Sequence, residues 1–267
     1  MRIAGYFLII LIPLLIILGN FHFLILNFNF YQNLYQKTGV YQTFADREIV
    51  NWATDNLFGY FRGKNELDHI FFSKQAILHL ADVKNLLQFE SGLFYLSAVA
   101  TAVISTIFVV KKQYKRLTSS FFTSSIVTIF AICLLAFGLI WDFEPIFTKF
   151  HILLFKNELW LFPAHDNLVK LFPQQFFILF ANSLAVNIIV TCAVIALISA
   201  VLIFARRIPR IVNPWMNAKA NTYFRGYSAR SCKLEEQIPR AFSPRKFIDF
   251  IIHIKKCSNI DMIWNYN

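Results

Sequence analysis

Four long apolar runs dominate the pattern of hydrophobic and polar positions in this chain. They cover about residues 3–26, 93–110, 121–140 and 180–205, and none of them contains Asp, Glu, Lys or Arg. A helix that crosses a bilayer needs roughly 20 apolar residues, so each run is long enough to span one. The first run is too long for the apolar part of a signal peptide and no small-residue cleavage site follows it, which favours a permanent anchor. The pattern predicts an all-α integral membrane protein with four transmembrane helices.

The composition agrees with this prediction. Hydrophobic residues make up 57% of the 267 positions, and the chain contains 31 phenylalanines. Charged residues account for only 15%, whereas soluble domains usually contain about a quarter. The four cysteines lie in apolar runs or near the C-terminus and include no C-x-x-C pair, so they predict neither a zinc ribbon nor an external disulfide.

The positions of Lys and Arg predict the orientation in the membrane. The loop 111–116 contains four cationic residues, and residues 206–210 contain three arginines. Cytoplasmic loops are enriched in such residues, which places both segments and both termini in the cytoplasm. Two polar segments, 28–92 and 141–177, then lie on the extracytoplasmic side. We expect short helices and loops in these two outer segments, and we expect the active face of the protein there.

The residues after the fourth run differ from the rest of the chain. Residues 206–267 contain twelve Lys or Arg and four acidic residues, so they carry most of the formal net charge of +11. Anionic lipid headgroups attract such a segment, and this explains the charge better than nucleic-acid binding does. The sequence therefore predicts a membrane core, residues 1–205, followed by a basic cytoplasmic tail, residues 206–267.

The first outer segment contains an amphipathic stretch, 73–87, in which apolar residues recur every three or four positions. Ser73 is a typical N-cap for the predicted helix. His79 and Asp82 are three positions apart, so they lie on one side of it. Asp82 can hold one ring nitrogen of His79, which fixes the tautomer and raises the basicity of the ring. This pair predicts acid–base chemistry.

The second outer segment places His151 between Phe150 and Ile152. An imidazole without a partner is costly in apolar surroundings, so His151 needs a hydrogen bond or a chemical role. The chain lacks the G-x-S-x-G, P-loop, G-x-G-x-x-G and H-E-x-x-H motifs, and no cofactor is expected. A zinc-dependent membrane hydrolase is an alternative, because two histidines and one carboxylate can bind zinc. The candidate carboxylates are Asp82, Asp142 and Glu144.

Two motifs of the outer segments resemble the bacterial lipoprotein intramolecular transacylase (Lit) family. The first is F-F-S-x-x-x-x-x-H-x-x-D-V-K at residues 71–84. The second is F-H-x-x-L-F-x-N-x-x-W-L-x-P-x-x-D at residues 150–166, followed by L-F-P-x-x-F-F at residues 171–177. The resemblance covers the chain up to about residue 205. It implies a multi-pass enzyme of the bacterial cell membrane.

The resemblance also implies the reaction and the residues that perform it. The sn-2 acyl chain of the diacylglyceryl group on a lipoprotein's N-terminal cysteine moves to the α-amino group of that cysteine, which gives an N-acyl lyso-form. The family's essential histidines match His79 and His151. We hypothesise that His79, oriented by Asp82, is the base and that His151 is the acid or electrostatic group, with the reverse assignment open. Asn157 and Trp160 are supporting hydrogen-bond donors or residues that pack the loop and anchor it at the interface.

The implied reaction needs no ATP, metal or carrier, because an amide is more stable than the ester it replaces. We expect a diacylated lipoprotein and membrane lipid as partners, with no obligatory protein partner. The alternative outside enzymology is an accessory subunit of a channel or transporter, whose spans should carry polar faces. Asn182, Ser183 and Asn187 in the fourth run hint at such a face.

Overall fold

The computed structural model describes residues 2–44 and 46–205, and the predicted basic tail lies outside the described residues. The described part is helical and contains no strand, which confirms the predicted all-α class. Its elements are α1 (Arg2–Ile25), α2 (Phe28–Thr38), α3 (Val40–Thr43), α4 (Arg47–Phe61), α5 (Lys74–Val110), α6 (Tyr114–Trp141), α7 (Phe143–Leu154), α8 (Asn167–Leu171) and α9 (Gln174–Ala205).

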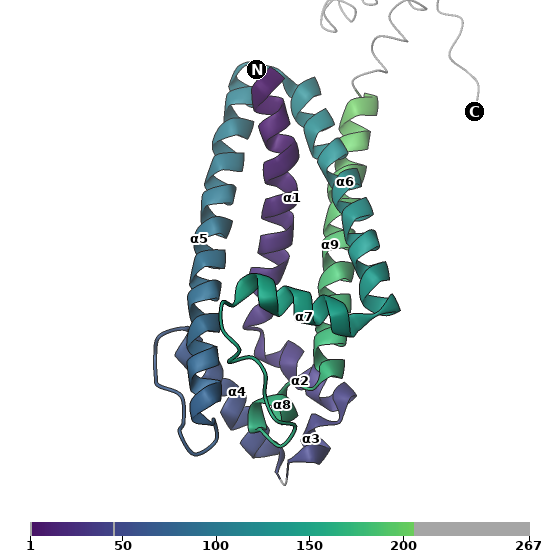
Figure 1. Ribbon diagram of the computed structural model, residues 1–267. Coiled ribbons are helices and arrows are strands. Elements are labelled where there is room, and N and C mark those ends of the chain that lie inside the picture. Colours follow the sequence, from purple (N-terminus) through teal and green to yellow (C-terminus); the bar gives the residue numbers. More distant parts are fainter. Residues whose placement is uncertain (1, 45, 206–267) are drawn as a thin grey trace, which may run out of the picture. The chain divides into compact units, whose positions relative to one another are not determined.

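Among residues 2–44 and 46–205, four helices are long and apolar enough to cross a membrane, namely α1, α5, α6 and α9. In the described part α1 packs against α5, α6 and α9, and α6 lies along α9 (Figure 1). Small side chains are buried on both α6 and α9, including Ser124, Thr128 and Ala196. Small residues let two helix backbones approach closely, which is how spanning helices associate in lipid.

Helix α5 joins two elements that the sequence predicts separately. The amphipathic stretch 73–87 and the apolar run 93–110 form one helix of 37 residues, and Gly92 does not interrupt it. Ser73 is its N-cap, as predicted, and its side chain accepts a hydrogen bond from Ala76 N. The helix is about 55 Å long, whereas a hydrocarbon core is about 30 Å thick. Residues 74–92, which contain the charged positions of α5, therefore precede its membrane-spanning part.

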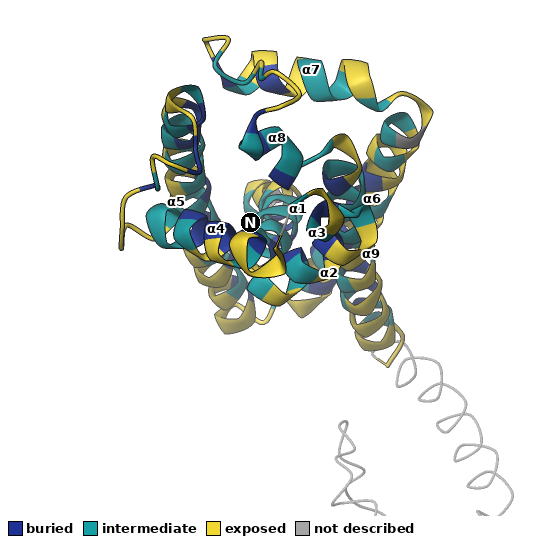
Figure 2. Cartoon of the chain, turned by 90° about the horizontal axis from the view of Figure 1, so that it is seen from below, coloured by how far each residue is buried: buried dark blue, intermediate teal, exposed yellow. Residues whose placement is uncertain are grey.

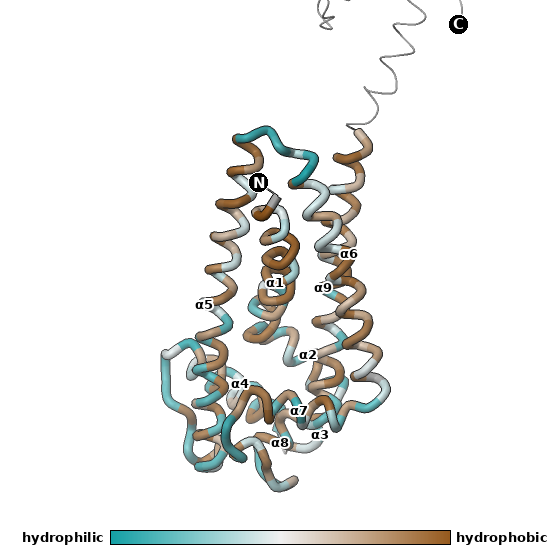
Figure 3. The backbone as a smooth tube through the Cα atoms, turned by 45° about the horizontal axis from the view of Figure 1, so that its top comes forward, coloured by the Kyte–Doolittle hydropathy of each residue, from teal (hydrophilic) through white to brown (hydrophobic). Residues whose placement is uncertain are grey.

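The short helices gather at the end of the bundle where α5 begins (Figure 1). Here α2, α4, α8 and the first turns of α5 and α9 share one core, whose fully buried members include Tyr35, Phe58, Phe72 and Phe176. Figure 3 shows hydrophilic residues at this end and at the α5–α6 turn, with hydrophobic residues along the spans between them. We call this end the α2–α4 end.

Helix α7 lies across the long helices at the α2–α4 end, and α2 and α4 lie on the opposite side of α1 (Figures 1 and 2). One side of α7 is apolar and exposed, with Ile152 and Leu153 at 65% and 82% exposure. His151 lies on its other side and is buried. An amphipathic helix of this kind suits a membrane interface. Helix α7 places His151 close to the first turns of α5, where His79 lies.

Candidate active site

His79 lies on the second turn of α5 and is only 8% exposed. Its ring is surrounded by aromatic side chains, with centroids 4.9 Å from Phe155 and 5.6 Å from Phe162. The Nδ1 atom of His79 is buried and has no hydrogen-bond partner among the described residues. Burial, and then the charge of a protonated His151, lower the pKa of His79 to about 4, while Asp82 acts in the opposite direction. His79 is therefore neutral at physiological pH.

His151 lies in the last turn of α7 and is also 8% exposed. Its Nδ1 is 2.8 Å from the carbonyl oxygen of Phe147. A carbonyl oxygen only accepts hydrogen bonds, so Nδ1 must carry the hydrogen. Burial lowers the pKa of His151 below its ordinary 6.5, although the bond to Phe147 acts in the opposite direction. The neutral ring thus presents Nε2 as an unprotonated acceptor.

The two histidines lie side by side although they come from different outer segments. Their ring centroids are 6.4 Å apart and the ring planes differ by 29°. Phe155 contacts both, at 4.9 Å from His79 and 5.7 Å from His151. The sequence motifs alone do not show that these two residues meet. The structure brings them together beneath the loop that follows α7.

That loop, residues 155–166, is fastened to α5 by side chains on both sides of His79. The Nε2 of Gln75 donates to the carbonyls of Leu159 and Leu161, at 3.1 and 2.8 Å. The Nδ2 of Asn157 donates to Oδ2 of Asp82 at 2.9 Å. Gln75 and Asp82 are within one helical turn of His79, so they lie on the same face of α5. The loop is therefore tied down directly over the histidines.

The fastened loop places Trp160 against His151, with ring centroids 4.9 Å apart and planes inclined by 30°. The family profile described as lipoprotein intramolecular transacylase Lit matches residues 6–177 of this chain. The chain belongs to the Lit family. As a member it is an acyltransferase, a lipoprotein intramolecular transacylase. Residues 79, 82, 151, 157 and 160 all lie within the matched range.

Solved structures of Lit from Bacillus cereus have the same fold. One in meso structure superimposes with a TM-score of 0.70 at 20% identity, and the match covers 78% of this chain and 97% of that chain. A structure of the same protein with one histidine replaced by arginine gives a TM-score of 0.66 at 20% identity, with 78% and 93% covered. That protein is a membrane-integral enzyme by its description, and its likeness agrees with the four apolar helices found here. No curated protein matches this chain.

In this Lit-family enzyme the hydrogen-bond partner of Asp82 is not the one that the sequence predicts. The sequence predicts that Asp82 holds a ring nitrogen of His79. Among the described residues the Asp82 side chain instead accepts from Asn157, and Nδ1 of His79 has no partner. Asp82 thus influences His79 through its charge and positions the loop through Asn157. The reason is geometric: a residue three positions along a helix shares a face with His79, but its carboxylate reaches outward to the loop.

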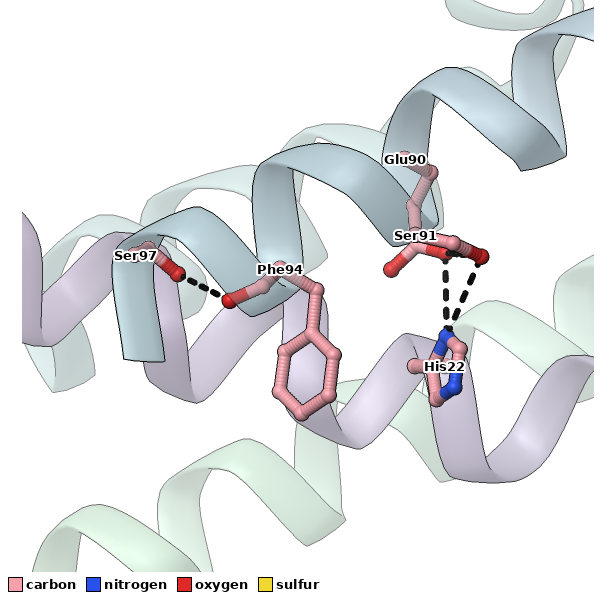
Figure 4. Close-up of polar contacts among 5 residues, drawn as sticks. All are labelled: His22, Glu90, Ser91, Phe94 and Ser97. Carbon is pink, nitrogen blue, oxygen red and sulfur yellow. Dashed lines mark hydrogen bonds and ion pairs between the residues drawn. The ribbon is translucent and has the colours of Figure 1, made fainter. Parts of the chain in front are cut away.

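Gln75 and Glu90 make polar contacts that the sequence pattern does not predict. Gln75 resembles any exposed helical glutamine in sequence, because its two partners lie more than eighty residues further along the chain. Glu90 is buried and its Oε2 lies 3.3 Å from Nδ1 of His22 in α1 (Figure 4). Asp166 ties the end of the loop to α5, because its side chain accepts a hydrogen bond from Ser73 Oγ at 2.7 Å, and it also caps α8.

The proposed zinc alternative needs a cluster of ligands. Among the described residues, no group of three or more His, Cys, Asp or Glu side chains is placed to hold a metal ion. Asp142 and Glu144 lie at the opposite end of α7 from His151. The histidine pair is thus set among aromatic rings, with the Asp82 carboxylate hydrogen-bonded to Asn157.

Proposed function

We propose that this enzyme transfers the sn-2 acyl chain of a lipoprotein's diacylglyceryl-cysteine to the α-amino group of the same cysteine, and that His79 and His151 perform the proton transfers. The observation that carries this proposal is the pair of buried, neutral imidazoles whose rings lie 6.4 Å apart. Family membership supplies the substrate class, a lipoprotein. The roles of the two histidines follow from their different hydrogen bonds.

His151 is the general base. Its Nδ1–H is committed to the Phe147 carbonyl, so Nε2 is free to accept a proton. An α-amino group has a pKa of about 7.7–8.0 and must lose a proton to attack an ester. A neutral imidazole in hydrogen-bonding reach accepts that proton. This assignment reverses the one favoured by the sequence, in which His79 was the base.

His79 is the hydrogen-bond donor. Its Nδ1 is buried and has no partner in the described part of the chain, and an unpaired buried N–H is rarer and more costly than an unpaired acceptor. The favoured tautomer therefore carries its hydrogen on Nε2. A neutral imidazole can polarise a carbonyl and stabilise the oxyanion of a tetrahedral intermediate. The low pKa of His79, about 4, keeps it in this neutral donor form.

The reaction balances without any further reactant. The amine nitrogen forms a bond to the ester carbonyl carbon, and His151 takes the proton from that nitrogen. The bond from the carbonyl carbon to the glycerol sn-2 oxygen then breaks, and the proton passes to that oxygen as a hydroxyl group. Because amine and ester belong to one molecule, positioning alone contributes a large effective molarity. Asp82, Asn157 and Trp160 support the reaction by holding the loop over the pair.

The active end lies on the extracytoplasmic side in this proposal. The α5–α6 turn, which is at the opposite end of α5 from His79, contains Lys111 and Lys112, and the first turn of α6 adds Lys115 and Arg116 (Figure 1). Cationic residues of this kind favour the cytoplasm. The amphipathic α7 then lies in the outer interface, close to the level of a lipoprotein's glycerol esters.

Mass spectrometry of lipoprotein N-termini tests the proposed reaction. Cells that lack lyso-form lipoproteins should convert diacyl forms to N-acyl lyso-forms when they express this chain. Addition of a metal chelator to isolated membranes should leave the conversion unchanged. Release of free fatty acid without N-acylation, or loss of activity with chelator that added zinc restores, would instead identify a hydrolase.

The dependence of activity on pH should reflect the lowered pKa of His151. The base works in its neutral form, so activity falls when the pH drops below this pKa, and burial places that loss below pH 6.5. Toward higher pH the rate should rise until the α-amino group, with a pKa of about 8, is deprotonated. Initial rates of lipopeptide conversion between acid and alkaline pH measure this profile. A profile that falls only with the titration of the amine near pH 8, with no second loss of activity below pH 6.5, would contradict the assignment.

A further inference from the structure

A cavity of about 550 Å³ lies among α1, α9 and Phe94 of α5. We call it the α1–α9 groove. On one side it follows the chain from Leu15 to Asn27, which corresponds to about 18 Å of helical rise. On the other side it is lined by Asn187 and Thr191 of α9. Its volume is within the range of about 300–1,000 Å³ that is typical of ligand pockets.

The α1–α9 groove is separate from the histidine pair. None of its lining residues belongs to α7, to the loop 155–166 or to residues 74–92 of α5. Phe94 lies about 22 Å beyond His79 along α5, so one glycerol group cannot occupy both places. Asn27 begins α2, which lies on the opposite side of α1 from α7 (Figure 2).

The α5 wall of the groove is built by specific contacts. Phe94 stacks on the His22 ring at a centroid distance of 4.9 Å, and Glu90 holds the Nδ1 of His22 (Figure 4). A Cβ atom on Gly19 would lie 3.2 Å from the Phe94 ring, so glycine lets that ring approach α1 closely. The wall is therefore fixed by packing and by a hydrogen bond.

The Asn187 amide is the unusual feature of this groove. It is exposed inside a membrane-spanning helix, and its side chain has no hydrogen-bond partner among the described residues. The neighbouring polar groups are engaged: Thr191 donates to the Asn187 backbone carbonyl at 2.8 Å and contacts Asn20 Oδ1 at 3.4 Å. The Asn20 amide donates to Ile16 O. An unpaired amide is costly in hydrocarbon, which points to an acceptor supplied from outside the chain.

We propose that the α1–α9 groove binds an acyl chain of a diester glycerolipid of the bilayer, with the Asn187 amide donating to its ester carbonyl. The groove runs from Asn27, beyond the end of α1, to Leu15 deep in the span, so an acyl chain lies along it with its ester near the polar end. An ester carbonyl is the acceptor that a lipid offers at this depth. The occupant is a bilayer lipid, because the lipoprotein's glycerol group is required at the histidines.

Comparison of a diester phospholipid with its diether counterpart tests the hydrogen bond directly. The two lipids share chains and headgroup, but the diether lacks carbonyl acceptors. One neutral hydrogen bond predicts about 3- to 10-fold tighter binding of the diester to the purified protein, measured by displacement of a fluorescent lipid. Asn187→Leu should abolish this preference. Asn182→Leu, which changes the same residue type outside the groove, should retain it. Equal binding of both lipids to the wild type, or a preference that survives in Asn187→Leu, would overturn the proposal.

A second measurement needs no variant. A phospholipid with a photoreactive group on its acyl chain should label Phe23, Phe94 or Leu15 in the wild-type protein, and labelling confined to other surfaces would overturn the proposal. A diacylated lipopeptide should not displace the bound lipid; displacement would assign the groove to the substrate instead. The lipid-binding proposal and the acyl-transfer proposal are tested independently. His151→Ala should keep the preference for the diester lipid, and Asn187→Leu should keep lipoprotein conversion.

Discussion

Replacing His151 by alanine is expected to lower the rate of lyso-form production about 10²- to 10⁴-fold, the range for loss of a general base. The folded protein should remain in the membrane, because within the described part of the chain the side chain makes one hydrogen bond, to the carbonyl of Phe147 in its own helix. His79→Ala should cost about 10²- to 10³-fold, the range for loss of an oxyanion donor. Conversion of a diacylated lipopeptide by purified enzyme, followed by mass spectrometry, measures both values.

Asparagine variants separate the two roles. His79→Asn keeps an N–H donor, so it should retain more activity than His79→Ala. His151→Asn supplies no base and should be as inactive as His151→Ala. Added imidazole should restore part of the activity of His151→Ala. The exposed His165, in the same loop, provides the matched control, and His165→Ala should be close to wild type. The opposite asparagine pattern would show that the roles are exchanged.

The second large effect is expected at Gln75, which acts through the loop. Gln75→Ala removes two hydrogen bonds to the carbonyls of Leu159 and Leu161. Each contributes about 0.5–1.5 kcal/mol, so the ratio of the closed to the open position of the loop should fall about 5- to 160-fold, and the maximal rate should fall as the open position becomes populated. The acid limb of the pH profile should not move, because neither histidine is changed. Gln75→Glu should be at least as impaired, since a carboxylate cannot donate to carbonyls.

Trypsin provides a readout of the loop itself. Lys156 is exposed within the loop, and cleavage after it should accelerate in Gln75→Ala as the loop opens more often. Gln88→Ala, an exposed glutamine on the same helix, should leave both cleavage and activity unchanged. A Gln75→Ala enzyme with normal proteolysis and a normal rate would show that the hydrogen bonds from Gln75 are not needed to hold the loop.

The protonation states of the two histidines depend on their surroundings in the folded protein. A protonated histidine cannot accept a further proton, whereas a neutral histidine has a free ring nitrogen that can take a proton from an amine. Aromatic rings around His79 and His151 keep both neutral. The backbone carbonyl of Phe147 then distinguishes between them by fixing one tautomer. The same apolar shell suits the acyl chain that must be transferred.

The membrane class, the four spans and the family motifs that contain the two histidines can be read from residue order alone. These properties are local: the length of an apolar run and the periodicity of a helix depend on neighbouring residues, so they can be read along the chain. Family membership followed for the same reason, because the motifs around residues 71–84 and 150–166 are contiguous. The single helix α5 was missed because charged residues and Gly92 separate its two patterns, although neither stops a helix.

The partner of each polar side chain, in contrast, depends on how the helices and loops pack. The partner of Asp82 is Asn157 instead of His79, and Gln75 binds carbonyls of a loop that follows a different helix. The tautomer of His151 depends on the distance from its Nδ1 to one carbonyl oxygen. The pairing of His22 with Glu90, and the lack of a partner for the Asn187 amide within residues 2–44 and 46–205, likewise depend on how α1, α5 and α9 pack. A hydrogen bond requires two groups to meet at about 3 Å in the right direction. These groups come from segments that are far apart in the sequence, so their meeting depends on the packing of the helices.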